Sequence, residues 1–322
     1  MAGLSAAQLA RFNEDGYLVV EGVLAPRRDI EPLLGEYAQV LDGIAESFHA
    51  DGVLAATYRE LPFTERLIQV CKESGRSVSQ HFDISLPQTG VLPTTPIHLG
   101  PATFSLLTSP RLLDVVESIV GPEIYSNPVQ HIRMKLPPHA VTNKSSDGLS
   151  TSVPWHQDNG VILPEADEAT ILTVWMPLND ATLENGCLRV VPRSHRGDLI
   201  PHCPGPKGAS IPDTLVRVGE ALPVPLRAGS LLLLNQRIVH SSLDNVTRDQ
   251  VRISLDLRYQ PIGQPTGRPA FPGFVARSAA HPETVLRDPA NWARLWLDTR
   301  ARLSEQETPS FNRWQAGVGF CA

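Results

Sequence analysis

The stretch Val153-Pro154-Trp155-His156-Gln157-Asp158-Asn159-Gly160 decides how the rest of the chain is interpreted. Its core is a histidine and an aspartate separated by one residue. Side chains two residues apart on a β-strand point to the same face, so His156 and Asp158 are predicted to approach one metal ion together. One imidazole and one carboxylate supply two of the three ligands in the 2-His-1-carboxylate set that holds non-heme Fe(II). The His-x-Asp pattern is short and common, so it indicates a metal site only if another histidine elsewhere in the chain completes the set.

A second histidine is predicted to complete the set. His240 lies in Asn235-Gln236-Arg237-Ile238-Val239-His240-Ser241-Ser242, between two segments that are expected to be buried strands. Arg252 follows twelve residues after His240, and Ser254 comes next on the same strand face. A planar guanidinium binds a carboxylate through two parallel hydrogen bonds and stays charged when buried. The spacing therefore predicts an iron site beside an arginine and a serine that anchor the far carboxylate of a diacid such as 2-oxoglutarate.

Length and composition restrict the class of protein. The chain has 322 residues, of which 42% are hydrophobic and 19% charged, and its formal net charge is -6. These values are typical of a soluble globular protein, and the lack of a basic excess argues against a nucleic-acid partner. No run approaches the ~18 apolar residues of a membrane span, and the polar N-terminus lacks an apolar signal core. We expect a cytoplasmic protein without nucleic-acid or membrane partners, either a monomer or a homodimer.

The cysteines stand far apart and form no Cys-x-x-Cys pair. They are Cys71, Cys187, Cys203 and Cys321. This spacing predicts neither a zinc knuckle nor a disulfide framework, and it is typical of a reducing compartment.

The remaining pattern predicts short strands flanked by helices. Helices are expected to begin at or near Ser5, Pro26, Thr64, Ser109 and Asp288. Strands are expected over residues 17–20, 124–136, 170–177, 186–192, 230–234 and 251–259, and loops over 84–104 and 137–152. This pattern indicates a mainly β fold, closed or double-sheeted, with helices at both ends. We expect one domain, with helical padding over about 1–122, a β core over 123–262 and a C-terminal loop and helix over 263–322.

Several of these stretches carry a resemblance to a known family. They are residues 4–17, 155–158, 185–195, 228–230 and 240–242, together with Arg252. Over nearly its whole length the chain resembles the phytanoyl-CoA dioxygenase (PhyH) family of Fe(II)- and 2-oxoglutarate-dependent oxygenases. The resemblance implies a double-stranded β-helix, a cupin-like jelly roll with iron at one mouth.

The resemblance also implies roles for individual residues. The metal ligands would be His156, Asp158 and His240, and Arg252 would hold the distal carboxylate of 2-oxoglutarate. Further cosubstrate contacts are implied at Trp175, Ser242, Gln130 and Lys135. Lys135 is followed by one residue more than in the family's usual Lys-Pro-Pro. Related halogenases have a small residue in place of the Asp158 carboxylate, so halogenation is not expected.

Candidates for contact with the substrate are more numerous. The histidines that precede the metal motif could line the substrate mouth: His81, His98, His131 and His139. Asn159, directly after the motif, is a further candidate. Arg258 is the second choice for the carboxylate anchor, because it lies further from His240. The other histidines are expected at the surface or satisfied in the core: His49, His195, His202 and His281. The loops over 205–211 and 260–274 either carry specificity or connect strands.

The sequence thus predicts an oxygenase that uses Fe(II), O2 and 2-oxoglutarate to oxidise a small-molecule metabolite. The simplest outcome is hydroxylation of a C–H bond with release of succinate and CO2, but desaturation, epoxidation and ring closure need the same cofactors. Two other classes stay open: a metal-dependent hydrolase on the same three ligands, and a barrel that binds a ligand without turnover. No basic cluster is visible along the sequence, which argues against an acyl-CoA ester as substrate.

Overall fold

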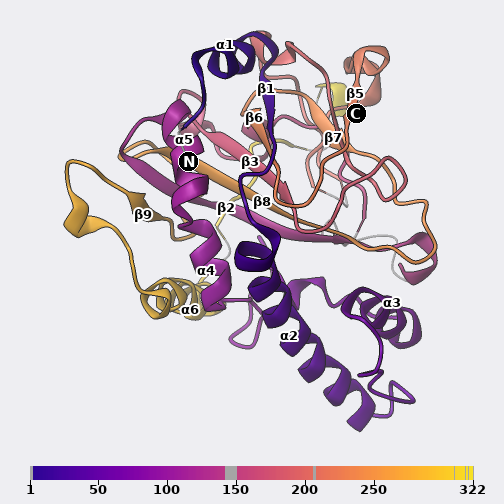
Figure 1. Cartoon of the computed structure of the whole chain (residues 1–322). Coiled ribbons are helices and arrows are strands. Elements are labelled where there is room, and N and C mark those ends of the chain that lie inside the picture. Colours follow the sequence, from indigo (N-terminus) through magenta and orange to yellow (C-terminus); the bar gives the residue numbers. More distant parts are fainter. Residues whose placement is uncertain are drawn as a thin grey trace.

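Two antiparallel sheets form the centre of the molecule (Figure 1). The computed structural model describes residues 3–141, 151–205, 208–307, 309–315, 317 and 319–321. The larger sheet has the strand order β1-β6-β3-β8-β2-β9, and the smaller has the order β5-β4-β7. The strands are β1 (Tyr17–Val20), β2 (Ile124–Lys135), β3 (Leu172–Pro177), β4 (Leu188–Val190), β5 (Leu222–Val224), β6 (Leu231–Asn235), β7 (His240–Ser242), β8 (Arg252–Pro261) and β9 (Phe274–Arg277).

The predicted mainly β class is confirmed, and the sheet extends beyond the segment expected to form it. β1 comes from the N-terminal segment and pairs with β6, while β9 comes from the C-terminal segment and pairs with β2. The strands β5, β7 and β9 were not predicted, because each has only three or four residues and no clear alternation.

Helices cover the outer face of the larger sheet and one end of the molecule (Figure 1). They are α1 (Ala6–Asp15), α2 (Glu31–Ala50), α3 (Phe63–Ser74), α4 (Pro101–Leu107), α5 (Pro110–Val120) and α6 (Pro289–Glu305). The start and stop signals act as predicted. Ser5 and Gln8 form a capping box on α1, and Gly16, at φ 80°, ends that helix. Asp288 caps α6 by accepting a hydrogen bond from the Ala290 N–H.

The helix expected from Pro26 begins there, with a π-helical turn, Pro26–Ile30, that continues directly into α2 at Glu31. One predicted boundary was wrong. Residues 84–104 were predicted to be a loop, but α4 begins at Pro101. A proline at the first helical position lacks only an N–H that would have no partner there.

Strand β8 is buried on both faces, and the two faces differ in chemistry. The outer face is apolar and belongs to the main core: Ile253, Leu255, Leu257 and Tyr259. Helix α5 packs against this side of the sheet, and each fully buried Leu or Ile contributes about 1.5–3 kcal/mol. The inner face is polar and equally buried: Arg252, Ser254, Asp256 and Arg258. Burying such groups is costly unless each finds a partner, so the inner face indicates a functional site between the sheets.

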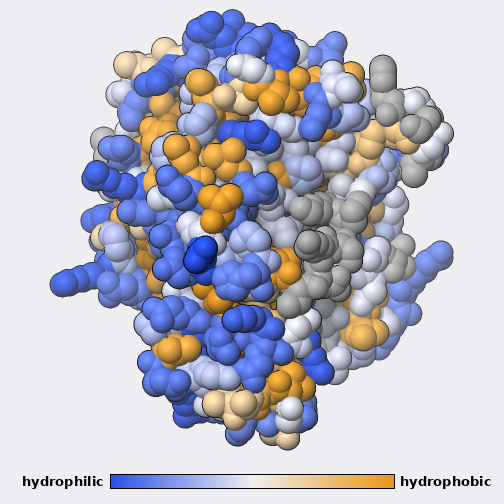
Figure 2. Space-filling view, turned by 90° about the vertical axis from the view of Figure 1, so that its right-hand side faces the viewer, coloured by the Kyte–Doolittle hydropathy of each residue, from blue (hydrophilic) through white to orange (hydrophobic). Residues whose placement is uncertain are grey.

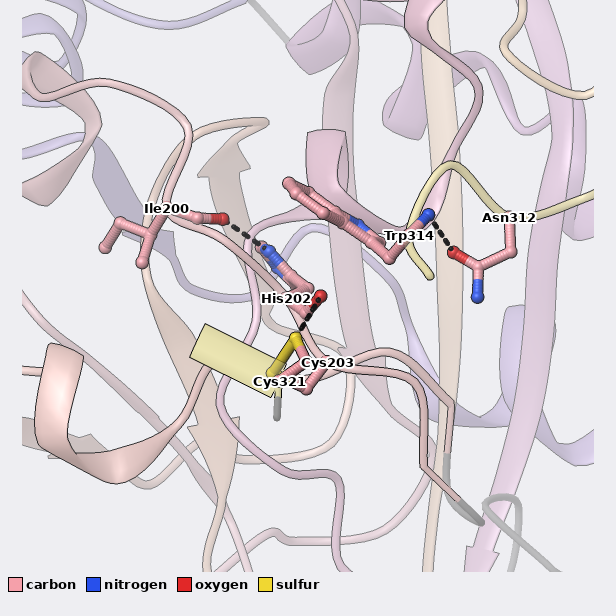
Figure 3. Close-up of a disulfide and its surroundings, with 6 residues drawn as sticks. All are labelled: Ile200, His202, Cys203, Asn312, Trp314 and Cys321. Atoms are coloured by element: carbon pink, nitrogen blue, oxygen red, sulfur yellow. Dashed lines mark hydrogen bonds between the residues drawn. A yellow bond between two sulfur atoms is a disulfide. The ribbon is translucent and has the colours of Figure 1, made fainter. Parts of the chain in front are cut away.

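A disulfide joins Cys203 to Cys321 across 118 residues of sequence (Figure 3). The expectation that the cysteines form no disulfide is therefore wrong. The sequence spacing could not reveal the bond, because the pairing depends on how the C-terminal segment folds back toward the loop that follows β4. Cys71 and Cys187 are buried and take part in no disulfide among the described residues.

The surface is mixed in character. On the side shown in Figure 2, hydrophilic side chains surround separate groups of apolar ones. Within the described residues, no helix combines the length and the apolar character needed to cross a membrane.

Candidate active site

The three predicted metal ligands meet between the sheets. Ligand atoms of His156, Asp158 and His240 all lie within 4.8 Å of one another. All three residues are buried. Nε2 of His156 lies 3.8 Å from Oδ1 of Asp158, and the centres of the two imidazole rings are 4.1 Å apart. Among the described residues, no other cluster of His, Cys, Asp and Glu comes together in this way.

The motif around His156 is not the strand that was predicted. The backbone N–H and C=O of His156 each bond to His240 at 3.0 Å, forming one isolated bridge. Asp158 already begins a 3-10 turn, Asp158–Val161, in which the Asn-Gly pair favours turning. Side chains still alternate in direction from His156 to Asp158, because Gln157 between them has extended backbone angles of φ -110° and ψ 141°. Both ligands therefore point to one side without a full strand.

Each imidazole is oriented through its Nδ1 atom. Nδ1 of His156 lies 3.0 Å from the Pro154 carbonyl, and Nδ1 of His240 lies 3.0 Å from the Ile238 carbonyl. An Nδ1–H that donates to a carbonyl leaves Nε2 free to bind a metal. Burial, together with the neighbouring His240, holds the pKa of His156 well below its usual value. The neutral form, which binds metals, is therefore favoured.

The Asp158 carboxylate is held at both oxygens. Nη2 of Arg258 donates to Oδ1 at 2.5 Å, and the Thr173 hydroxyl donates to Oδ2 at 2.5 Å. Burial alone would raise the pKa of Asp158, but Arg258 and the two histidines outweigh it and hold that pKa below its ordinary value. Arg258, predicted as an alternative anchor for the cosubstrate, thus contacts the metal ligand itself.

His202 supports the backbone of the metal motif, a role that the sequence did not reveal. It is fully buried, and its Nε2 accepts a hydrogen bond from the Gln157 N–H at 2.9 Å. Its Nδ1 lies 2.7 Å from the Ile200 carbonyl, and Trp314 stacks on its ring (Figure 3). Burial lowers the pKa of His202 to about 4. Its prediction as a satisfied core histidine is consistent with these bonds.

Arg252 has the environment of a site for an anion. It is fully buried and stands opposite Lys135 in the pairing of β8 with β2. Its Nη1 donates to the Ser254 hydroxyl, and its guanidinium carbon lies 5.4 Å from the centre of the Trp175 ring. Its Nε and Nη2 atoms have no hydrogen-bond partner among the described residues. Burial lowers the pKa of Arg252 to about 9, so the group stays charged at neutral pH.

Lys135, an implied cosubstrate contact, lies opposite this arginine and bonds to Ser242, another implied contact. Nζ of Lys135 donates to the Ser242 hydroxyl at 2.6 Å and to the Leu243 carbonyl. Burial lowers the pKa of Lys135 to about 6, and the positive charge of Arg252 contributes to this shift. Two basic groups close together, one with unpartnered N–H groups, suit a dicarboxylate such as 2-oxoglutarate.

A cavity of about 470 Å³ opens beside the metal ligands. His156 and the predicted His131 line it, together with three arginines: Arg133, Arg258 and Arg268. The alternation of polar residues along β2 and β8 could have indicated Arg133 and Arg258. Arg268 and the tail residues Phe311 and Asn312 carry no local signal. Separate segments therefore assemble a basic cluster that is not visible along the sequence. The absence of such a cluster was the argument against an acyl-CoA ester as substrate, and that argument no longer holds.

Other candidates lie away from this cavity. They are Gln130, His81, His98, His139 and Asn159. Gln130 precedes His131 on β2, so its side chain points to the opposite face. His98 bonds to Glu36 at 3.0 Å. The Asn159 amide reaches the Asp167 carbonyl at 3.4 Å. A contact of these residues with substrate or cosubstrate stays a prediction.

Solved structures share this fold. The non-heme monooxygenase ThoJ, in its apo form, superposes with a TM-score of 0.55 at 19% identity, covering 92% of this chain and 96% of that chain. EvdO2 from Micromonospora carbonacea var. aurantiaca, complexed with 2-oxoglutarate, gives a TM-score of 0.51 at 22% identity, covering 84% and 98%. The predicted jelly-roll core is confirmed. A 2-His-1-carboxylate set inside this fold defines the class of non-heme iron oxygenases.

The chain belongs to the phytanoyl-CoA dioxygenase (PhyH) family, whose model matches residues 12–254. Phytanoyl-CoA dioxygenase domain-containing protein 1 of Bos taurus is 26% identical over 260 residues, covering 77% of this chain and 87% of that protein. Ectoine dioxygenase of Nocardia farcinica (strain IFM 10152) is 22% identical over 290 residues, covering 83% and 84%. The chain is accordingly a 2-oxoglutarate-dependent non-heme iron dioxygenase, as the sequence predicted.

Proposed function

We propose that the chain hydroxylates a C–H bond of a small-molecule metabolite. In this proposal the iron is held by His156, Asp158 and His240, and the distal carboxylate of 2-oxoglutarate by Arg252. The supporting observation is the state of Arg252, a fully buried guanidinium with two nitrogens that have no partner among the described residues. A buried charge of this kind destabilises the fold unless a ligand pairs with it. A metal-dependent hydrolase on the same three ligands would have no use for it.

When bound, iron and 2-oxoglutarate supply the oxidising power by which one atom of O2 enters succinate and the other enters the substrate. The chain's own residues prepare the site for this chemistry. Thr173 and Arg258 keep the Asp158 carboxylate ionised and fixed in orientation. Trp175 and Leu234 give apolar surface to the small space beside His240, which Arg133 and Asp256 also line.

Succinate formation with Fe(II) and 2-oxoglutarate, measured with and without candidate metabolites, tests this function. His240→Ala should abolish both iron binding and succinate formation. Arg252→Ala should keep its iron while the KM for 2-oxoglutarate rises about 10–100-fold, since hydrogen bonds to a charged group are worth about 1.5–3 kcal/mol each.

The matched control is His281→Ala, because the His281 side chain is 71% exposed. This variant should bind iron and form succinate as the wild type does. Full activity in His240→Ala would contradict the proposed metal site. An unchanged KM in Arg252→Ala would contradict the proposed anchor. Mass spectrometry of the product separates hydroxylation, a gain of one oxygen atom, from desaturation, a loss of two hydrogens.

A further inference from the structure

The cavity beside the metal ligands has an excess of positive charge. Three arginines line it, and no described aspartate or glutamate does. Two of the arginines are paired with carboxylates. Arg258 lies 2.5 Å from Asp158, and Arg133 lies 3.6 Å from Asp256. Their charges are therefore largely balanced by the protein itself.

Arg268 is the cation that the described residues leave unbalanced. It is 2% exposed, and of the charged side chains only the like-charged Arg258 is found to act on it. Nη2 donates to the Val161 carbonyl at 2.8 Å, whereas Nε has no partner among the described residues. Burial and the neighbouring Arg258 lower the pKa of Arg268 to about 10, so it is protonated at neutral pH. A buried cation without a counter-charge is costly unless it binds an anion.

The guanidinium of Arg268 is held in a fixed place. It lies over the rings of Phe271 and Phe311, with its carbon 5.9 Å and 5.2 Å from their centres. The preceding residue, Gly267, has φ 67°, and a Cβ there would lie 2.7 Å from Ile162. Only glycine allows the loop to approach this closely. A guanidinium positioned in this way needs little reordering when it binds a ligand.

The cofactors would not cancel the excess charge. Iron(II) and 2-oxoglutarate bring equal and opposite formal charges, so the cavity stays cationic with both bound. Its volume of about 470 Å³ lies within the range of about 300–1,000 Å³ that is typical of small-ligand sites. His156 lines the same cavity, so a ligand held there would also reach the metal site.

We propose that the substrate carries an oxyanion, a carboxylate or a phosphate, which binds Arg268 in this cavity. The inference rests on the proposed function, because it makes the bound anion the substrate whose C–H bond is oxidised. Arg268 is then a substrate-binding residue that discriminates against neutral analogues of the same shape.

Calorimetric binding to the Fe(II)-loaded enzyme tests this inference. Saturating N-oxalylglycine, an unreactive analogue of 2-oxoglutarate, occupies the Arg252 site, so that only a second anion site is measured. The ligands are hexanoate, hexyl phosphate and the neutral, matched hexanamide. We expect one or both anions to bind at least tenfold more tightly than hexanamide, and the stronger of the two identifies the oxyanion. Arg268→Gln should lose that preference, and Arg268→Lys should keep part of it.

The control variant is Arg217→Gln, at a side chain that is 65% exposed; it should bind as the wild type does. Equal affinity for hexanoate, hexyl phosphate and hexanamide in the wild type would overturn the inference, even if every variant failed to fold. So would anion binding that disappears once N-oxalylglycine is present, because the anion would then occupy the Arg252 site. Succinate formation without substrate is measured separately. If succinate forms while the preference for anions is absent, the result supports the oxygenase function and contradicts the proposed substrate class.

Discussion

Asp158 depends on two residues whose contact with its carboxylate the sequence pattern did not indicate. Thr173 and Arg258 each donate to one oxygen of its carboxylate. Such contacts fix the orientation of a metal ligand and commonly change metal affinity about 10–100-fold. The ligands themselves could be predicted, because residue type and spacing along the chain identify them. Thr173 could not, since a buried threonine on an apolar strand has no distinguishing signal until β3 is placed beside the motif.

Thr173→Val tests this support, because valine keeps the shape and removes the hydroxyl. We expect iron affinity to fall about tenfold or more. The hydroxyl helps to lower the pKa of Asp158, and the ionised form binds iron. As pH falls, protonation of the carboxylate releases the metal, and the higher pKa in the variant moves this loss to higher pH. Equilibrium iron binding, measured from neutral pH down to the lowest pH at which both proteins stay folded, shows both effects.

A matched control is Thr299→Val, at a buried threonine in α6 whose hydroxyl, within the described part of the chain, bonds only to the Leu295 carbonyl. It should leave iron binding unchanged. If Thr173→Val bound iron as tightly as the wild type at every pH, the hydroxyl would have no role in the metal site.

We predict that Lys135 makes the binding of 2-oxoglutarate dependent on pH. Burial and Arg252 lower its pKa to about 6, so above that pH the lysine of the free enzyme is mostly neutral. A bound dicarboxylate favours the charged form and raises this pKa. Binding near pH 7.5 should therefore take up a proton, and affinity should fall as pH rises above about 6. Calorimetry in buffers of different ionisation enthalpy measures the uptake, which Lys135→Met should abolish. The same uptake in that variant would assign the proton to another group.

At the scale of elements, capped helices could be predicted and short connecting segments could not. Ser5 and Asp288 mark their helices because capping is a local interaction. The three-residue β7 depends on pairing with distant segments, so local pattern did not reveal it. The C-terminal tail is the clearest case. Its contacts with the metal motif, including the hydrogen bond from Trp314 Nε1 to the Gly160 carbonyl at 2.6 Å, join residues 154 apart in sequence.

The disulfide should stabilise this tail against unfolding. It links residues separated by 118 positions, and bonds that close long loops contribute about 2–4 kcal/mol, mainly by restricting the unfolded chain. Reduction with dithiothreitol should therefore lower the Tm of the wild type. Cys321→Ser should show the lower Tm with or without reductant, and Cys203→Ser, which breaks the same bond from the other end, should match it. A wild-type Tm that is the same with and without reductant would show that the disulfide adds no stability.

At the scale of the whole molecule, the larger sheet separates stability from chemistry. Its outer face packs against helices through an apolar core, while its inner face carries the polar residues of the site. The class of fold could be predicted, because alternation and turn residues are visible in the sequence. The way the sheets assemble could not, since β1 pairs with β6, and the paired residues Val20 and Leu231 are 211 positions apart. The cluster of arginines in the cavity is a consequence of that assembly.

Substitutions on the two faces of β8 should consequently have different effects. Leu255 is fully buried on the outer face, so Leu255→Ala should lower the free energy of unfolding by about 2–5 kcal/mol and leave the affinity for 2-oxoglutarate unchanged. Arg252→Met, on the inner face, replaces an unpartnered buried charge with an apolar chain of similar length. Such replacements are often neutral or stabilising, so the enzyme without cosubstrate should be at least as stable as the wild type, while its affinity for 2-oxoglutarate falls sharply. Urea unfolding and cosubstrate titration of both variants measure this contrast. If Arg252→Met instead lost as much stability as Leu255→Ala, the guanidinium would be part of the fold's support rather than a group held ready for a ligand.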